Sequence, residues 1–163
     1  MIRTAMIIIA LTASAPAAAA TAPLFDASGK IIGKARIIQT SHSLQLRVKV
    51  KGLEPGEKGL HIHAVGKCEA PKFTSAGPHW NPDGKQHGRD NPMGSHAGDM
   101  PNLIVNAKGR GSIAFDLHGA KMTGDGGLLD ADGAALIIHA KADDYRTDPT
   151  GNSGDRIVCG VFR

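Results

Sequence analysis

The sequence predicts an all-β protein, an antiparallel sandwich or barrel of short strands. Apolar and charged residues alternate without a break over residues 44–50, which is typical of a half-buried strand with Leu44, Leu46, Val48 and Val50 facing the core. The chain has 21 glycines among its 163 residues, a content that suits many turns and few long helices. Short apolar segments also alternate with turn-forming residues, as in antiparallel sandwiches and barrels.

Further strands are predicted on either side of this one, at residues 31–40, 59–65, 103–106, 112–117, 134–140 and 156–162. Residues 26–29 form a turn before the first of them, residues 53–57 form a loop, and residues 107–111 are a hairpin connection. Two polar loops, residues 66–101 and 143–155, are unusually long. Loops of this length are uncommon unless they are functional or pinned, so we expect function in them.

The first twenty residues are predicted to be a secretory signal peptide. Met1-Ile2-Arg3 gives a positive start, residues 5–15 are apolar, and Ala18-Ala19-Ala20 fits a cleavage site after Ala20, within two residues. The apolar run is short for a bilayer span, and a buried N-terminal helix is the less favoured alternative. Residues 21–163 would then form one mature domain of about 140 residues. A short, alanine-rich signal favours the periplasm, with secretion as the other destination.

Charge and composition exclude some partners. The formal net charge is +4, but lysines and arginines are scattered, with no basic run and no interleaved aromatic residues. The sequence therefore predicts no nucleic-acid partner, and none in the membrane after signal cleavage. A mildly positive balance fits a small anionic substrate.

The two cysteines, Cys68 and Cys159, are isolated in the sequence. In an exported protein an even pair predicts an intramolecular disulfide. A cysteine metal site is the weaker reading, because the chain has no C-x-x-C motif.

Six of the eight histidines, together with Asp99, form a set of candidate metal ligands: His61, His63, His79, His87, His96 and His139. Neutral imidazole is the commonest protein ligand for zinc and copper. Packing alone does not explain such clustering in one loop and its flanking strands, so the sequence predicts a metalloprotein.

Spacing limits how these ligands can be shared. Residues two apart on a strand face the same side, so His61 and His63 can reach one ion while Ile62 faces the core. His139 lies on another predicted strand and can complete that site. Three histidines and a carboxylate make a good tetrahedral zinc set. Two ions with one shared ligand would use all seven residues, and His79 is the economical bridge, although spacing alone does not show it.

The chain resembles the copper/zinc superoxide dismutase family over essentially all of its mature length. The matching segments are Gly59-Leu60-His61-Ile62-His63, Thr74-Ser75-Ala76-Gly77-Pro78-His79-Trp80-Asn81-Pro82, Lys85-Gln86-His87-Gly88, His96-Ala97-Gly98-Asp99, Leu136-Ile137-Ile138-His139-Ala140-Lys141-Ala142-Asp143-Asp144 and Gly151-Asn152-Ser153-Gly154-Asp155-Arg156-Ile157-Val158-Cys159-Gly160-Val161. These motifs are long and occur in the same order as in the family.

The resemblance implies an eight-stranded antiparallel Greek-key barrel, an immunoglobulin-like sandwich, that dismutes superoxide to oxygen and hydrogen peroxide with one copper and one zinc ion per subunit. Copper would be bound by His61, His63, His79 and His139, and zinc by His79, His87, His96 and Asp99. Asp143 would hydrogen-bond a ligand histidine of each metal, and Arg156 would hold the superoxide anion. A Cys68–Cys159 disulfide would tie the metal loop to the last strand.

The chain departs from the family pattern in two places. Its second loop is short and carries Asp148-Pro149-Thr150 where many relatives have charged residues, which leaves the steering of superoxide by that loop open. Asp130 and Asp132 put charge where the dimer surface of the animal enzymes is apolar. A monomer and a homodimer through another face both remain open.

Two other functions fit parts of the pattern. A catalytically silent copper/zinc-binding protein would share the ligands, but we would expect it to lack Arg156 or a copper ligand. A two-zinc hydrolase also uses His-x-His, but commonly has Asp two residues later, where this chain has Val65.

Overall fold

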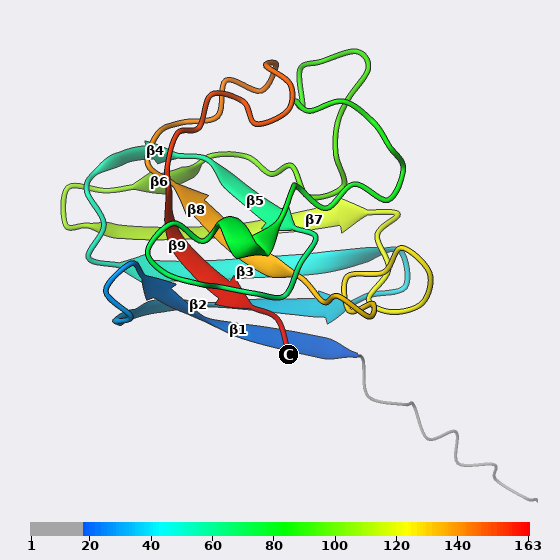
Figure 1. Ribbon diagram of the computed structural model, residues 1–163, viewed down its shortest axis with the longest axis horizontal. Coiled ribbons are helices and arrows are strands. Elements are labelled where there is room, and N and C mark those ends of the chain that lie inside the picture. Colours follow the sequence, from blue (N-terminus) through cyan, green and yellow to red (C-terminus); the bar gives the residue numbers. More distant parts are fainter. Residues whose placement is uncertain (1–17) are drawn as a thin grey trace, which may run out of the picture.

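A computed structural model describes residues 18–163 as a single antiparallel sheet (Figure 1). Its strands are β1 (Ala19–Asp26), β2 (Ile31–Gln39), β3 (Ser43–Lys51), β4 (Gly56–Lys58), β5 (Leu60–His63), β6 (Leu103–Val105), β7 (Arg110–His118), β8 (Ala135–His139) and β9 (Arg156–Val161). One 3-10 turn, η1 (Thr74–Ala76), interrupts the first long loop. No helix within residues 18–163 is long and apolar enough to cross a membrane.

The sheet curls into a nearly closed barrel. Its strand order is β4-β6-β7-β3-β2-β1-β9-β8-β5, so the two edge strands, β4 and β5, are neighbours in the chain. The connections from β3 to β4 and from β7 to β8 cross over other strands, as in Greek-key folds. The predicted all-β antiparallel barrel is confirmed, with nine strands instead of eight. The extra strand arises because residues 56–58 pair with β6, whereas residues 60–63, beyond Gly59, pair with β8.

The core forms from alternate residues of the strands. Leu44, Leu46, Val48 and Val50 of β3 are all buried, as their alternation with polar residues predicts. On β5, Ile62 is fully buried in the same apolar cluster. This packing turns the side chains of His61 and His63 to the other face of the strand, toward the loops.

The two predicted long loops are present, and the second lies beside the later part of the first along one side of the barrel (Figure 1). Backbone hydrogen bonds hold the first loop against β5: Trp80 N donates to Ile62 O at 2.8 Å and Ile62 N donates to Gly98 O at 3.0 Å. The predicted disulfide Cys68–Cys159 is also present and joins this loop to β9. The loop backbone is therefore held beside the strand that carries His61 and His63.

Two strands were not predicted. Strand β1 pairs with β2 from Ala19↔Ile38 onward, and β4 lies where the sequence predicts a loop. The predicted cleavage point after Ala20 falls within β1, so cleavage two residues earlier would retain the whole strand. Residues 1–17 of the predicted signal peptide lie outside the described residues.

Candidate metal centre

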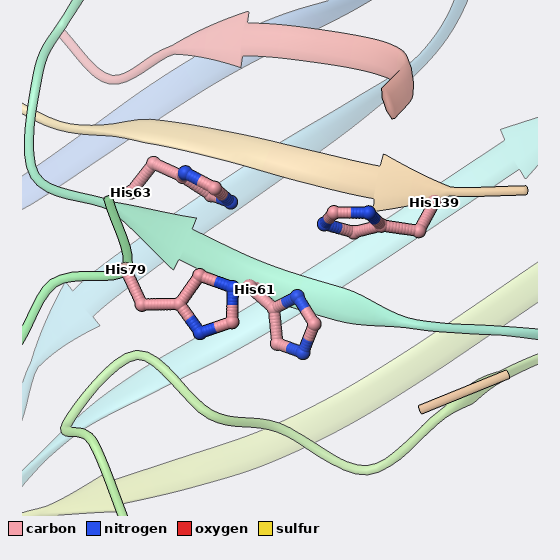
Figure 2. A group of neighbouring side chains, drawn as sticks. All are labelled: His61, His63, His79 and His139. Atoms are coloured by element: carbon pink, nitrogen blue, oxygen red, sulfur yellow. The ribbon is translucent and has the colours of Figure 1, made fainter. Parts of the chain in front are cut away.

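Four histidines from two strands and a loop converge on one point (Figure 2). His61 and His63 project from β5, His139 from the end of β8, and His79 from the first loop. One ring nitrogen from each lies within 4.8 Å of the other three. All four residues are buried. The structure thus brings together the four side chains assigned to one ion in the sequence.

Hydrogen bonds leave one nitrogen of each ring free. His63 Nδ1 donates to Gly77 O at 2.8 Å, His139 Nδ1 donates to Gly154 O at 3.0 Å, and His61 Nε2 lies 2.6 Å from Asp143 Oδ2. The opposite nitrogens are buried without a hydrogen-bond partner among the described residues: His61 Nδ1, His63 Nε2, His79 Nε2 and His139 Nε2. Buried polar atoms are rarely left unpaired, so four such nitrogens facing one another fit a bound metal ion.

A second group of ligand atoms lies on the other side of the His79 ring. Asp99 Oδ1 is 3.0 Å from His79 Nδ1 and 3.0 Å from His87 Nδ1. His96 Nδ1 is 3.2 Å from His79 Nδ1 and 3.3 Å from the same Asp99 oxygen. Ligands about 2.0–2.1 Å from zinc in a tetrahedron are about 3.3–3.4 Å apart, so these contacts match a zinc set.

His61 also falls within 4.8 Å of His79, His87 and Asp99. We assign the fourth position of the second group to His96 instead, because His61 Nε2 is already engaged by Asp143. With this assignment the His79 ring is the only one that faces both groups, with Nε2 toward the first and Nδ1 toward the second.

The carboxylate of Asp143 contacts one histidine of each ligand group. Its Oδ2 accepts from His61 Nε2, and its Oδ1 lies 3.1 Å from His87 Nε2. The carboxylate is held in turn by Tyr145 N, which donates to Oδ1 at 2.7 Å, and by a two-way hydrogen bond between the backbone of Asp143 and the side chain of Asn102. One buried carboxylate therefore orients a histidine of each group.

Burial and hydrogen bonds set the protonation of these side chains. Burial lowers the pKa of His63 to about 2, that of His61 to about 3 and that of His139 to about 4, so all three are neutral and can act as ligands near pH 7. Burial opposes the charge of His87 as well, but hydrogen bonds with Asp143 and Asp99 raise the pKa of that histidine to about 9. Although burial opposes ionisation of Asp99, hydrogen bonds from the three histidines hold its pKa well below the usual range.

Arg156 lies at the mouth of the first group. Its guanidinium donates to Phe73 O and Gly77 O, both at 2.9 Å, which fixes its position. An open pocket of about 530 Å³ is lined by Arg156 and His79 together with Pro149 and Thr150 of the second loop. A small anion in this pocket would meet a fixed positive charge beside the His79 residue.

Two backbone carbonyl groups also belong to the site, and the sequence did not predict them. Gly77 O accepts from both His63 and Arg156, and Gly154 O accepts from His139. These groups belong to every residue alike, so no side-chain pattern identifies them. The contact of Asn102 with Asp143 was not predicted either, because Asn102 follows a loop with many polar residues and nothing in the sequence distinguishes it from them.

Fold and site together define a β-barrel protein with two adjacent groups of candidate metal ligands, between which the His79 ring lies. The sequence model described as copper/zinc superoxide dismutase (SODC) matches residues 31–162, and the chain belongs to this family. The family that the sequence motifs predicted is therefore confirmed.

The proteins to which this chain is similar carry three kinds of name. Superoxide dismutase [Cu-Zn] 2 of Aquifex aeolicus is 44% identical over 147 residues, which cover 88% of this chain and 86% of the relative. The crystal structure of a SOD-like protein from Bacillus subtilis matches with a TM-score of 0.82 and 42% identity over 86% of this chain and 96% of that one. The clock protein EA4 matches with a TM-score of 0.75 and 31% identity over 94% and 98% of the two chains.

Proposed function

We propose that the protein dismutes superoxide, converting two superoxide anions and two protons to oxygen and hydrogen peroxide. The observation that carries this proposal is the His79 ring, which presents one nitrogen to each ligand group while Arg156 lines the pocket beside it. Membership of the copper/zinc dismutase family supports the same chemistry.

We assign copper to His61, His63, His79 and His139, and zinc to His79, His87, His96 and Asp99. The four unpartnered nitrogens favour copper at the first group, since imidazole suits that ion. The second group, three histidines and a carboxylate at tetrahedral spacing, favours zinc. Bound copper supplies two oxidation states one electron apart, which lets one superoxide be oxidised and the next reduced.

Side chains of the protein would bind the superoxide anion and transfer the proton. The Arg156 guanidinium offers fixed paired donors to a diatomic anion at the pocket mouth. His79 also lines this pocket, and its buried Nε2 is positioned to hold a proton and pass it to the product. Asp143 keeps His61 and His87 in the orientation that both groups need.

Superoxide consumption by the protein loaded with copper and zinc tests the proposal, with Arg156→Ala and His139→Ala measured beside it. We expect rapid consumption that is lost in His139→Ala. In Arg156→Ala the rate should fall more at low salt than at high salt, because salt screens attraction between the arginine and the anion. A fully metallated protein that consumes no superoxide would refute the dismutase assignment.

A catalytically silent copper- and zinc-binding protein is the second candidate function. It is favoured by relatives named SOD-like, such as the Superoxide dismutase-like protein YojM of Bacillus subtilis, 44% identical over 147 residues. All seven candidate ligands and Arg156 are present in this chain, which weighs against this candidate. Tight binding of both metals without superoxide consumption would favour this candidate.

We also propose that the protein is exported after removal of a signal peptide ending near Ala20, to the periplasm or the cell exterior. The N-terminal pattern of a basic start, an apolar run and small residues supports this. The disulfide Cys68–Cys159 is consistent with it, since such bonds persist in oxidising compartments. N-terminal sequencing of the protein purified from a fractionated cell would test both location and cleavage point.

A further inference from the structure

The exposed residues of β2 and β3 are nearly all cationic. They are Ile31, Lys34, Arg36, Arg47, Lys49 and Lys51, so five of the six carry a positive charge. Every other residue of these two strands is buried or half-buried. The cations are separated in the sequence by apolar residues, and only the pairing of the strands gathers them on one surface. We call this surface, together with Arg110 of β7, the basic face.

Strand register places like charges directly opposite one another on the basic face. Lys34 is opposite Lys49, Arg36 is opposite Arg47, and Lys51 of β3 is opposite Arg110. Like charges at opposed positions repel and destabilise a sheet. Three such pairs in a row make a concentrated positive field that folding alone does not favour.

No carboxylate within residues 18–163 forms an ion pair with any of these six cations. Arg47 hydrogen-bonds the side-chain oxygen of Gln45, and Gln45 in turn contacts Asp116, at the far end of the strands. The positive charge of the basic face is thus left for a partner outside the chain to neutralise.

An apolar residue lies at one end of the basic face. The Ile31 side chain is 59% exposed, and it borders an open hollow of about 510 Å³ with Ile32 and Val50. Lys34, Lys49, Lys51 and Arg110 line the same hollow. Aliphatic surface ringed by cations suits a partner that offers both anionic groups and a hydrocarbon layer beneath them.

We propose that the basic face docks the protein on an anionic phospholipid bilayer. The lipid phosphates would contact the paired lysines and arginines, and Ile31 would enter the boundary between headgroups and acyl chains. A second copy of this chain fits poorly, because it would bring the same cations face to face. Single-stranded nucleic acid also fits less well, since none of the exposed residues of β2 and β3 is an aromatic on which bases could stack.

Docking in this way leaves the metal-ligand groups accessible. In the sheet, β2 and β3 are separated from β8 and β5 by β1 and β9 on one side, and by β7, β6 and β4 on the other. Figure 1 shows the second long loop and the later part of the first on the side of the molecule away from β1 and β2, whereas η1 is drawn across the middle of the barrel. The bound protein would therefore keep its pocket open to solvent near the membrane.

Sedimentation with vesicles tests this proposal. The probes are vesicles of pure phosphatidylcholine and of phosphatidylcholine mixed with phosphatidylglycerol, added to the metal-loaded protein without its signal peptide. We expect binding only to the mixed vesicles, weakening with salt as the Debye length shortens from about 10 Å at 0.1 M to about 3 Å at 1 M. The double variant Lys34→Gln/Lys49→Gln should bind on the order of 25-fold more weakly, about fivefold per charge.

The matched control, Lys67→Gln/Lys121→Gln, removes two exposed charges that lie outside the basic face and should change vesicle affinity less than twofold. Ile31→Ser should weaken vesicle binding severalfold but leave binding to soluble polyphosphate and to DNA unchanged. Thermal melts of all variants check folding. No binding to mixed vesicles, equal losses in both double variants, or tighter binding to DNA or polyphosphate that Ile31→Ser does not alter would overturn the proposal.

Discussion

At the scale of single residues, one substitution tests whether Asp143 orients the candidate metal ligands. Its two oxygens contact His61 and His87, so Asp143→Ala removes the partner that orients a histidine of each group. Loss of such an outer partner typically weakens metal affinity 10- to 100-fold. We expect that loss for zinc in competition with a chelator. Asp144→Ala is the matched control, since Asp144 contacts only loop residues such as Thr147 and Asn152, and equal losses in both variants would contradict the assigned role.

Gly151 supports the same carboxylate by having no side chain. Its φ is +62°, and a Cβ there would lie 1.9 Å from Asp143 Oδ1. Gly151→Ala should therefore displace Asp143 and lower zinc affinity as Asp143→Ala does. Gly119→Ala is the control, because Gly119 has a similar φ of +73° and open space around it. If both alanine variants lose stability but neither changes zinc affinity, Gly151 serves only the loop backbone.

At the scale of structural elements, the disulfide holds the first loop to β9. Cys68 and Cys159 are 91 residues apart, and the chain-entropy view gives a loop of this length about 4–5 kcal/mol as an upper figure. Reduction, or Cys68→Ser with Cys159→Ser, should lower the melting temperature by about 10 °C. The measurement is calorimetry of the metal-free protein with and without reductant. An unchanged transition would show that the bond does not stabilise the fold.

The strands that sequence reasoning found and missed differ in the strength of their side-chain pattern. Strand β3 alternates leucine or valine with polar residues, a signal that needs no tertiary context. The inward residues of β1 include Ala20 and Ala22, which are small, and the predicted signal peptide overlaps the start of the strand. Strand β4 has three residues, Gly56, Glu57 and Lys58, with no apolar residue among them. Only its pairing with β6 makes it a strand.

For the whole molecule too, features carried by side-chain type can be predicted from the sequence, whereas features set by the path of the backbone cannot. Histidine and aspartate side chains could be proposed as candidate ligands from the sequence, because their residue types and order carry the chemistry. What positions them could not be predicted, since Gly77 O and Gly154 O are set by the path of two loops. The basic face could not be predicted for a related reason: cations at alternate positions of two strands form no run in the sequence, and only the register between Lys34 and Lys49 brings them together. The proposed docking on a bilayer therefore revises the expectation, drawn from the scattered charges alone, that the protein has no membrane partner.

Burial of the histidines makes the stability of the whole metal-free protein depend on pH. Burial lowers the pKa of His61 to about 3, that of His63 to about 2 and that of His139 to about 4, from an ordinary value of 6.5. In the unfolded chain these rings take up protons near pH 6.5, so below that pH the unfolded state binds more protons than the folded state. Stability should therefore fall as the pH drops from about 6.5 to about 4, by about 1.4 kcal/mol per pH unit for each of the three.

Neither His87 nor Asp99 masks this slope, and burial also lowers the pKa of His79, which acts in the same direction. Hydrogen bonds raise the pKa of His87 to about 9 against the effect of burial, so its stabilising contribution is complete below pH 6.5 and is lost only as the pH rises toward about 9. The pKa of Asp99 is shifted downward, so its contribution disappears only at still lower pH. Urea unfolding of the metal-free protein between about pH 7 and about pH 4.5 measures the slope, and His63→Gln should reduce it by the share of one histidine. A stability that stays constant over this interval would mean that the histidines are not held neutral by the fold, and that the ligand groups open before any metal binds.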